Sequence, residues 1–276
     1  MLQEWKTIQP YFVLGTSRFF QTIWLKDGIS HFFSFTFDKS ESALLTVPDG
    51  CIDLLFEYSE TGMYAKVRGT VLQAKELANE PGHTYFGVRF IPGVVPWFLT
   101  GKAGDYVENE ISLKECVQDT TLIDMMTEME NYEDRIRCFL NFYESKQPEK
   151  SEMETKDVSF TVRNLIQESD GKIRIGDIVE KTGYSARYIN RLFDEKFGIS
   201  PKTYCKIVQF QKSLSELNES QSQRITDIAA GTGYYDQAQF SRDFKQYAGM
   251  TPKRYWKCVE EKGYSDHIIN LWQSVE

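Results

Sequence analysis

The chain has 276 residues, enough for about two domains of ordinary size. Hydrophobic residues make up 41% of it and aromatic residues 14%, which excludes a chain that is disordered throughout. The sequence has no apolar run of about 18 residues, and its first residues lack the apolar stretch of a signal peptide. We therefore expect no membrane partner and a location in the cytoplasm.

The net charge of −8 conceals an uneven distribution along the chain. Residues 172–257 hold 15 of the 32 basic side chains but only 9 of the 40 acidic ones, a net charge of +6. The rest of the chain carries the other 17 basic and 31 acidic side chains, a net charge of −14. The basic segment can meet the phosphates of a nucleic acid, whereas the acidic part is repelled by them and should face away.

The first ninety residues are predicted to form mainly strands. Residues 33–37 alternate apolar and polar side chains, as a half-buried strand does, and further strands are expected at 43–47, 52–58, 64–72 and 85–91. Pro48, Asp49 and Gly50 favour a β-turn, so we expect a hairpin between the strands on either side of them. We prefer this turn to a binding site at the same three residues.

After residue 93 the pattern changes and predicts helices at 94–100, 112–117, 122–129 and 132–143. Residues 146–157 are polar and charged, as is typical of a linker, and the chain beyond them is predicted to be helical only. The expected fold class is α+β. A β-rich barrel or sheet with a helical subdomain occupies residues 1–145, and an all-α domain occupies residues 158–276.

Two segments of the all-α part repeat one pattern at a spacing of fifty residues. Residues 175–184, IGDIVEKTGY, match residues 225–234, ITDIAAGTGY, at Ile, Asp, Ile, Thr, Gly and Tyr. The match continues with one extra residue in the second copy. A repeat this dense indicates a duplicated structural unit.

Each copy predicts a short helix, a turn at Thr-Gly-Tyr and a second helix. Ser185 and Asp236 stand where the second helices need an N-cap, and Ser200 and Pro201 favour the start of a helix over residues 203–217 that joins the copies. Helix, glycine turn, helix is the helix-turn-helix arrangement, whose second helix enters the DNA major groove. A plain helical bundle is the alternative, and two copies in register within the basic segment count against it.

From about residue 158 to residue 257 the chain resembles the DNA-binding domain of the AraC/XylS transcription regulators. The resemblance is carried chiefly by residues 225–255, which contain IxDIA, GYxDQxxFSRxFK and GxTPxxY in succession. The runs VPDGCIDL (47–54) and GVRFIPG (87–93) resemble an N-terminal domain found in a subset of these regulators. The resemblance implies binding to double-stranded DNA by the C-terminal domain, and effector sensing or dimerisation by the N-terminal domain.

The resemblance also implies that the exposed faces of the two second helices contact DNA. Carried over by position, the candidates are Arg187, Asn190 and Arg191 in the first copy, Gln237, Ser241 and Arg242 in the second, and Lys202 and Lys253 as phosphate partners. Arginine can hold guanine through O6 and N7, and Asn or Gln can hold adenine through N6 and N7. Arg191 and Arg242 serve equally well as phosphate clamps.

The sequence offers no catalytic or metal-binding motif. His31, His83 and His267 lie far apart, and the five cysteines form no CxxC pair. A glycine-rich phosphate loop and a nucleophile elbow are likewise missing from the sequence. We therefore expect no metal, no cofactor and no enzymatic activity.

The N-terminal domain is rich in aromatic residues, which suits an apolar pocket for a small-molecule effector. The candidate lining residues are Trp24, Phe56, Tyr85, Arg89 and Trp97. Arg89 can meet a ligand carboxylate or pair with Asp53, and we prefer the structural ion pair. Cys51 can act as a redox sensor, but a buried inert thiol is the preferred interpretation.

These patterns predict a sequence-specific transcription regulator of the AraC type, controlled by a small molecule at its N-terminal domain. The alternative is an enzyme or binding protein whose helical C-terminal part mediates protein contacts, and salt-dependent binding to duplex DNA separates the two. RNA polymerase is a further candidate partner, and so is a second copy of the chain, paired along residues 122–143. The sequence favours neither activation nor repression.

Overall fold

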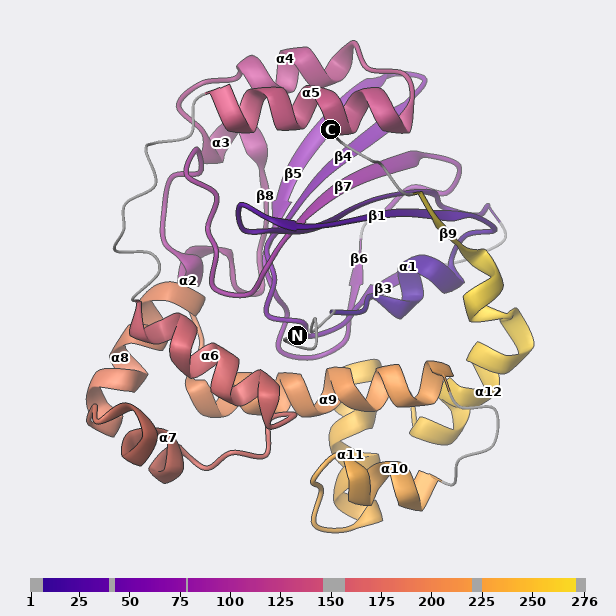
Figure 1. The fold of residues 1–276 in the computed structure, drawn as a ribbon. Helices are drawn as coiled ribbons and strands as arrows, with labels where there is room; N and C mark the ends of the chain where they lie inside the picture. Colours follow the sequence, from indigo (N-terminus) through magenta and orange to yellow (C-terminus); the bar gives the residue numbers. More distant parts are fainter. Residues whose placement is uncertain (1–6, 40–42, 78, 146–156, 220–224, 272–276) are drawn as a thin grey trace.

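The computed structural model of the protein describes residues 7–39, 43–77, 79–145, 157–219 and 225–271 (Figure 1). A curved β-sheet with two helices on its outer face forms one part of the molecule, and a set of helices forms the other. The helices that carry the repeat lie on the side away from the sheet, so the acidic sheet part and the basic part occupy opposite sides.

The main sheet contains seven strands in the order β8-β5-β4-β7-β2-β1-β9. Its strands are β1 (Phe19–Lys26), β2 (Ile29–Thr36), β4 (Asp53–Ser59), β5 (Gly62–Arg68), β7 (Thr84–Phe90), β8 (Glu110–Ser112) and β9 (Ile268–Asn270). All neighbours are antiparallel except β1 and β9, which are parallel. Strands β8 and β9 are the two edges of this sheet. Of the two expected architectures, a barrel or a sheet, the domain therefore has an open sheet.

Side chains alternate between the two faces of this sheet. On β7, Phe86 and Val88 belong to the core under the outer helices, whereas Tyr85 and Arg89 point to the opposite face. Gly87 lies between them because a Cβ atom there would come within 2.0 Å of Phe33 Cζ. The second face is the one turned toward the helical part of the molecule.

The outer face is covered by α4 (Thr121–Thr127) and α5 (Tyr132–Ser145) of the predicted helical subdomain, which α3 (Leu113–Cys116) precedes in the chain. The short helix α2 (Ala103–Tyr106) lies instead at the end of the sheet nearest the C-terminal helices (Figure 1). The apolar stripes of α4 and α5 pack on the sheet through residues such as Met126, Ile136 and Phe139, all fully buried. The apolar side chains of residues 122–143 therefore pack against the sheet of the same chain. This corrects the expectation that the apolar side chains of residues 122–143 pair with a second copy.

Two local expectations are wrong. The segments before and after Pro48-Asp49-Gly50 do not form a hairpin, because β3 (Leu44–Thr46) pairs with β6 (Lys75–Leu77) and β4 pairs with β5 and β7. Residues 94–100 are turns rather than a helix and end in a bridge between Leu99 and Val117. Pro96 restricts the residue before it and disfavours a helix there.

The C-terminal part is all-helical up to a short tail. Its helices are α6 (Val158–Glu168), α7 (Ile175–Thr182), α8 (Ala186–Phe197), α9 (Pro201–Glu219), α10 (Ile225–Gly231), α11 (Gln237–Ala248) and α12 (Pro252–Lys262), followed by the 3₁₀ helix η2 (Tyr264–His267). The long joining helix, α9, extends the predicted 203–217 by two residues at each end. The predicted linker lies outside the described residues except for Asp157, which caps α6.

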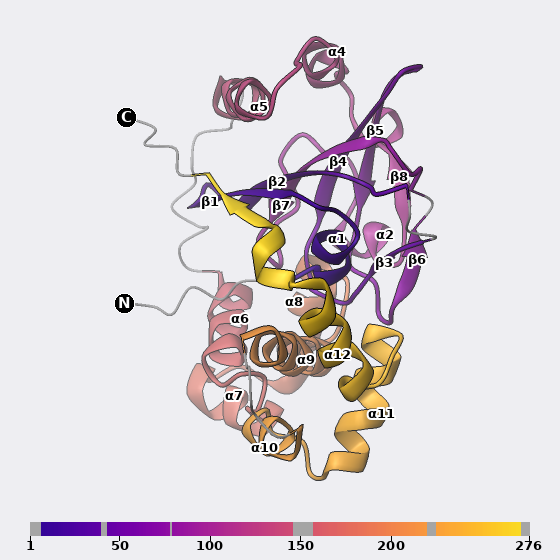
Figure 2. The same ribbon diagram turned by 90° about the vertical axis from the view of Figure 1, so that its right-hand side faces the viewer.

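The two parts are joined through more than the linker. The tail strand β9 pairs with β1 at the sheet edge, and Figure 2 shows the two side by side. The short helix α1 (Pro10–Leu14) packs into the helical part, where the Tyr11 hydroxyl donates to the carbonyl of Ala248 and the Tyr11 ring meets Tyr255 edge-on. A single apolar core therefore includes both α1 and the second helix-turn-helix unit.

Candidate DNA-binding surface

The first repeat copy folds as a helix-turn-helix unit made of α7 and α8. Gly183 ends α7 in the left-handed conformation, with φ of 74°. Ser185 then caps α8, its side chain accepting from the backbone N–H of Tyr188. Ile189 and Phe193, four residues apart on α8, are fully buried. The predicted turn, N-cap and buried face are all confirmed.

The second copy repeats this construction in α10 and α11. Asp236 caps α11 by accepting from the backbone N–H of Gln239 at 2.6 Å, and Phe240 and Phe244 are buried as Ile189 and Phe193 are. The αL residue before the turn is Gly233, with φ of 84°. The sequence repeat is therefore a structural repeat.

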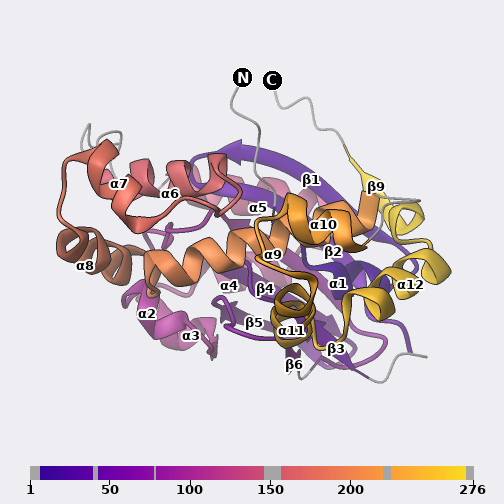
Figure 3. The ribbon, with the colours of Figure 1, turned by 90° about the horizontal axis from the view of Figure 1, so that it is seen from below.

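Helix α9 places the two units at a distance from each other. It is one continuous helix of 19 residues, which corresponds to about 28 Å of axial rise. Seen from below, α7 and α8 lie around one end of α9 and α10 and α11 lie toward its other end (Figure 3). Ser200 starts α9 by accepting from the backbone N–H of Thr203 at 3.1 Å, as predicted.

On α8 the three predicted contact residues are exposed. Arg187 and Arg191 have no ion pair within the described part of the chain, and the guanidinium of Arg191 lies over the ring of Tyr188 at 5.4 Å. The side-chain amide of Asn190 donates to the carbonyl of Ala186 at 2.8 Å. Because that bond uses only the amide nitrogen, the Asn190 Oδ1 atom can still accept a hydrogen bond from a bound molecule.

On α11 Gln237 and Arg242 are exposed, and Ser241 is half-buried. The predicted phosphate partners Lys202 and Lys253 are exposed near the starts of α9 and α12. By contrast, Lys196 pairs with Asp157 at 3.5 Å. The predicted residues thus lie on two open helix faces, where cations remain available for phosphates.

The structure adds tyrosines that the sequence reasoning did not select. Tyr235, in the turn before α11, is 94% exposed. Tyr184, before α8, is partly exposed and stacks on Tyr188 with ring centroids 5.0 Å apart. The extra residue of the second copy was the available signal, because it places Tyr235 where the first copy has its capping serine.

The five candidate effector residues divide between the two sheet faces. Trp24, Phe56 and Trp97 lie on the face under the outer helices, whereas Tyr85 and Arg89 lie on the inner face. Phe56 and Tyr85 are fully buried in packed cores. Only Arg89 borders the large cavity of the molecule that is described below.

Arg89 forms the predicted ion pair with Asp53. Its Nε and Nη2 atoms donate to the two carboxylate oxygens of Asp53 at 2.7 and 2.5 Å, and Nη2 lies 3.1 Å from Asp49 Oδ2. Burial opposes the charge of Arg89, but the Asp53 and Asp49 carboxylates beside it raise its pKa. Burial also raises the pKa of the Cys51 thiol well above its ordinary value, which makes the thiol unreactive.

The two N-terminal motifs that carried the family resemblance face the helical part. Gly50 lies against the ring of Tyr204, where a Cβ atom would come within 2.9 Å of Cε2, and Gly93 lies against Phe197. The side-chain amide of Gln211 on α9 donates to the carbonyl of Pro48 at 2.7 Å. The turn at 48–50 is therefore a docking point for the helix that joins the two units.

The described residues contain no group of three or more His, Cys, Asp or Glu side chains that is arranged to hold a metal ion. Among the same residues, no helix is long and apolar enough to cross a membrane.

Comparison with known proteins matches each part to a sequence family. Residues 178–257 match a family described as "Helix-turn-helix domain", and residues 23–112 match a "Domain of unknown function (DUF6597)". Among solved structures, an AraC-type transcriptional regulator from Chromobacterium violaceum is similar in fold, with 19% sequence identity and a TM-score of 0.36. The match covers 39% of this chain and 96% of the solved chain.

Two similar curated proteins are transcription regulators. The Msm operon regulatory protein of Streptococcus mutans is 29% identical over 113 residues, which is 41% of this chain but only 40% of the relative. The probable transcription factor PqrA of Proteus vulgaris is 31% identical over 102 residues, which is 36% of this chain and 80% of the relative. With its two helix-turn-helix units, the chain belongs to the AraC family of DNA-binding transcription regulators.

Proposed function

We propose that one copy of the chain reads two consecutive major-groove segments on one face of duplex DNA. The observation that carries this proposal is the placement of the two open recognition helices, α8 and α11, around opposite ends of α9. The axial rise of α9, about 28 Å, together with the width of the helices approaches the ~34 Å of one DNA turn. A slight bend of the DNA removes the remaining difference.

Footprinting with the full chain tests this arrangement. We expect an asymmetric footprint over two groove segments about one turn apart, because the two helices present different side chains. Arg242→Ala should remove protection from one segment and leave the other. Protection of a single segment, unchanged by Arg242→Ala, would contradict the proposal.

The proposal also sorts the exposed residues by role. Arg187→Ala or Gln237→Ala should cost roughly 1–3 kcal/mol on the preferred sequence and relax the preference at one base pair. Lys202→Ala should instead weaken preferred and random DNA alike and reduce the salt dependence, since a phosphate contact carries no sequence information. The measurement is affinity for both duplexes at two salt concentrations, with Arg137→Ala, an exposed residue of α5, as the control. Equal losses on both duplexes for all variants would refute this assignment of roles.

The remaining features of the proposed function concern regulation. We propose that a small molecule controls DNA binding through the sheet domain, which is docked on α9 and shares a core with the second unit. RNA polymerase and a second copy of the chain are the expected protein partners, and the cytoplasm is the expected location. An enzyme whose helical part mediates protein contacts would not show the tight, salt-dependent binding to duplex DNA expected here.

A further inference from the structure

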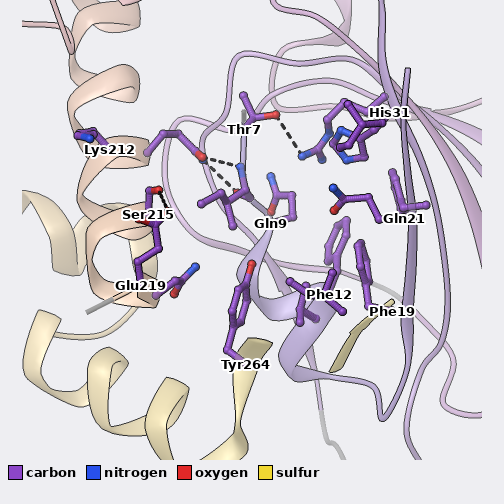
Figure 4. Close-up of a pocket in the computed structure, with 18 of the residues that line it drawn as sticks. Thr7, Gln9, Phe12, Phe19, Gln21, His31, Lys212, Ser215, Glu219 and Tyr264 are labelled. Carbon is purple, nitrogen blue, oxygen red and sulfur yellow. Dashed lines mark hydrogen bonds between the residues drawn. The ribbon is translucent and has the colours of Figure 1, made fainter. Parts of the chain in front are cut away.

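A large cavity among the described residues lies between the sheet and the DNA-binding helices. Its volume is about 820 Å³, within the range of small-molecule pockets, which favour domain interfaces. The wall on one side comes from β1, β2 and α1, and the wall on the other from α6, α9 and η2. Figure 4 shows Lys212, Ser215 and Glu219 of α9 on one side, and Phe12, Phe19 and Gln21 on the other.

A guanidinium without a carboxylate partner forms part of the cavity wall. Arg163 of α6 donates to the carbonyl of Pro92 at 3.2 Å and to Asn164 Oδ1 at 3.1 and 3.2 Å, all neutral acceptors. No ion pair to Arg163 occurs among the described residues. Arg163 is half-buried, and this partial burial lowers its pKa. An opposite charge placed beside a partly desolvated cation stabilises it.

The other charged groups of the cavity already have partners or are solvated. Arg89 is held by Asp53 and Asp49, and Lys212 pairs with Glu216 at 3.7 Å. The acidic residues that border the cavity lie at its solvent side or are engaged: Glu168 and Glu219 are exposed, and Asp170 pairs with Lys172. Arg163, which lies over the Phe160 ring at 4.8 Å, is therefore the cation of the described lining that has no carboxylate partner.

One lining residue, Asn218, has an unsatisfied donor on the side away from the cavity. The Nδ2 atom of Asn218 is buried and has no hydrogen-bond partner in the described structure, whereas its Oδ1 accepts from the Tyr255 hydroxyl at 2.6 Å. Buried amide N–H groups are normally satisfied in folded proteins.

Part of the sheet side of the cavity is formed by phenylalanine rings, beside the polar side chains of Gln21, His31 and Arg89. The rings of Phe19 and Phe33 are stacked, with centroids 5.8 Å apart and planes inclined by 12°, and Phe12 lies 6.0 Å from Phe33. Such a wall favours a hydrocarbon or aromatic body.

We propose that this interdomain cavity binds a small organic carboxylate with an apolar body, whose charge is met by Arg163 and whose body lies on the phenylalanine wall. A carboxylate fits one guanidinium because the two planar groups form paired hydrogen bonds. A doubly charged phosphate would leave half its charge without a partner there. The occupant touches the sheet, α6 and α9 at once, so it stabilises the docked arrangement of the two domains. Its effect on DNA binding rests on the proposed function, whereas the binding itself does not.

The test uses the full chain with phenylacetate and hexanoate as probes, each compared with its neutral amide. We expect both carboxylates to raise the thermal unfolding midpoint and to give saturable heats of binding, because a ligand of the folded state stabilises it. Phenylacetamide and hexanamide should have little effect, and acetate, which lacks an apolar body, should bind more weakly. Arg163→Met should weaken carboxylate binding at least about tenfold, and Arg163→Lys, which keeps the charge, should weaken it less.

Arg137→Met, which removes an exposed arginine of α5 outside the cavity, is the matched control and should bind as the unaltered chain does. The proposal is overturned if neither carboxylate binds below about 10 mM, or if the amides bind equally well. Unchanged binding by Arg163→Met would also overturn it. The comparison of acid with amide needs no variant, so a failure of Arg163→Met to fold leaves the test intact. DNA binding measured without any acid shows separately whether the proposed function holds.

Discussion

Replacing Arg89 with methionine is expected to lower the free energy of unfolding by about 3–5 kcal/mol, the usual cost of removing one partner of a buried ion pair. Arg89 is 1% exposed and faces both Asp53 and Asp49. Methionine fills much of the space but leaves two carboxylates in the interior without a cation. Urea unfolding of the full chain, followed by circular dichroism, measures the change.

The control for this prediction is Arg137→Met. Arg137 also forms an ion pair, with Asp134 at 2.6 Å, but its side chain is 68% exposed. Water solvates both groups there, so the control should leave the unfolding midpoint unchanged. If the two variants were equally stable, Arg89 would not hold its carboxylates in the way that its hydrogen bonds indicate.

Gly198→Ala should produce the second large loss, because Gly198 meets two constraints at once. It ends α8 in the left-handed conformation with φ of 67°, and a Cβ atom there would lie 2.6 Å from the backbone of Gly104 on α2. The conformational cost is roughly 1–2 kcal/mol. Overpacking against a backbone that cannot rotate away adds roughly 1–3 kcal/mol. The end of α8 should also move away from α2, which lowers DNA affinity.

Gly183→Ala provides a matched comparison for this prediction. Gly183 ends α7 with φ of 74°, but nothing lies within 4 Å of the added Cβ atom. It should therefore show the conformational cost alone, and the difference between the two variants measures the contact between the sheet domain and the first unit. Equal losses of stability in the two variants would mean that α2 and α8 separate freely.

These contacts give the N-terminal motifs a structural explanation. Gly50 and Gly93 lie where the sheet domain meets Tyr204 and Phe197, and Pro48 accepts a hydrogen bond from Gln211. Glycine is needed at both places because an aromatic ring packs directly on the backbone and φ is positive, at 77° for Gly50 and 86° for Gly93. The motifs form the surface through which the sheet domain holds the DNA-binding helices.

The DNA-binding part could be predicted from the sequence because its signals are local. Turn glycines, N-caps such as Ser185 and Asp236, and apolar residues four apart act within one or two helical turns. A repeat at fixed spacing then doubles every signal. The candidates Arg187 and Gln237 came from the family resemblance, and both lie on the exposed side of helices whose other face is buried.

Only the tertiary structure decided how the two parts are joined, because those contacts link residues far apart in the sequence. Strand β9 is short and pairs with β1 more than two hundred residues away, so no local pattern marks it. The turn at 48–50 was predicted as a turn. The pairing of the following strand, β4, with β7 and the contact of the turn with α9 depend on the whole sheet. Arg163 lies on an ordinary amphipathic helix, and its lack of an acidic partner follows from what surrounds it in space. The sequence by itself determined the two helix-turn-helix units, and the packing between domains determined the cavity and the contacts between the sheet domain and those units.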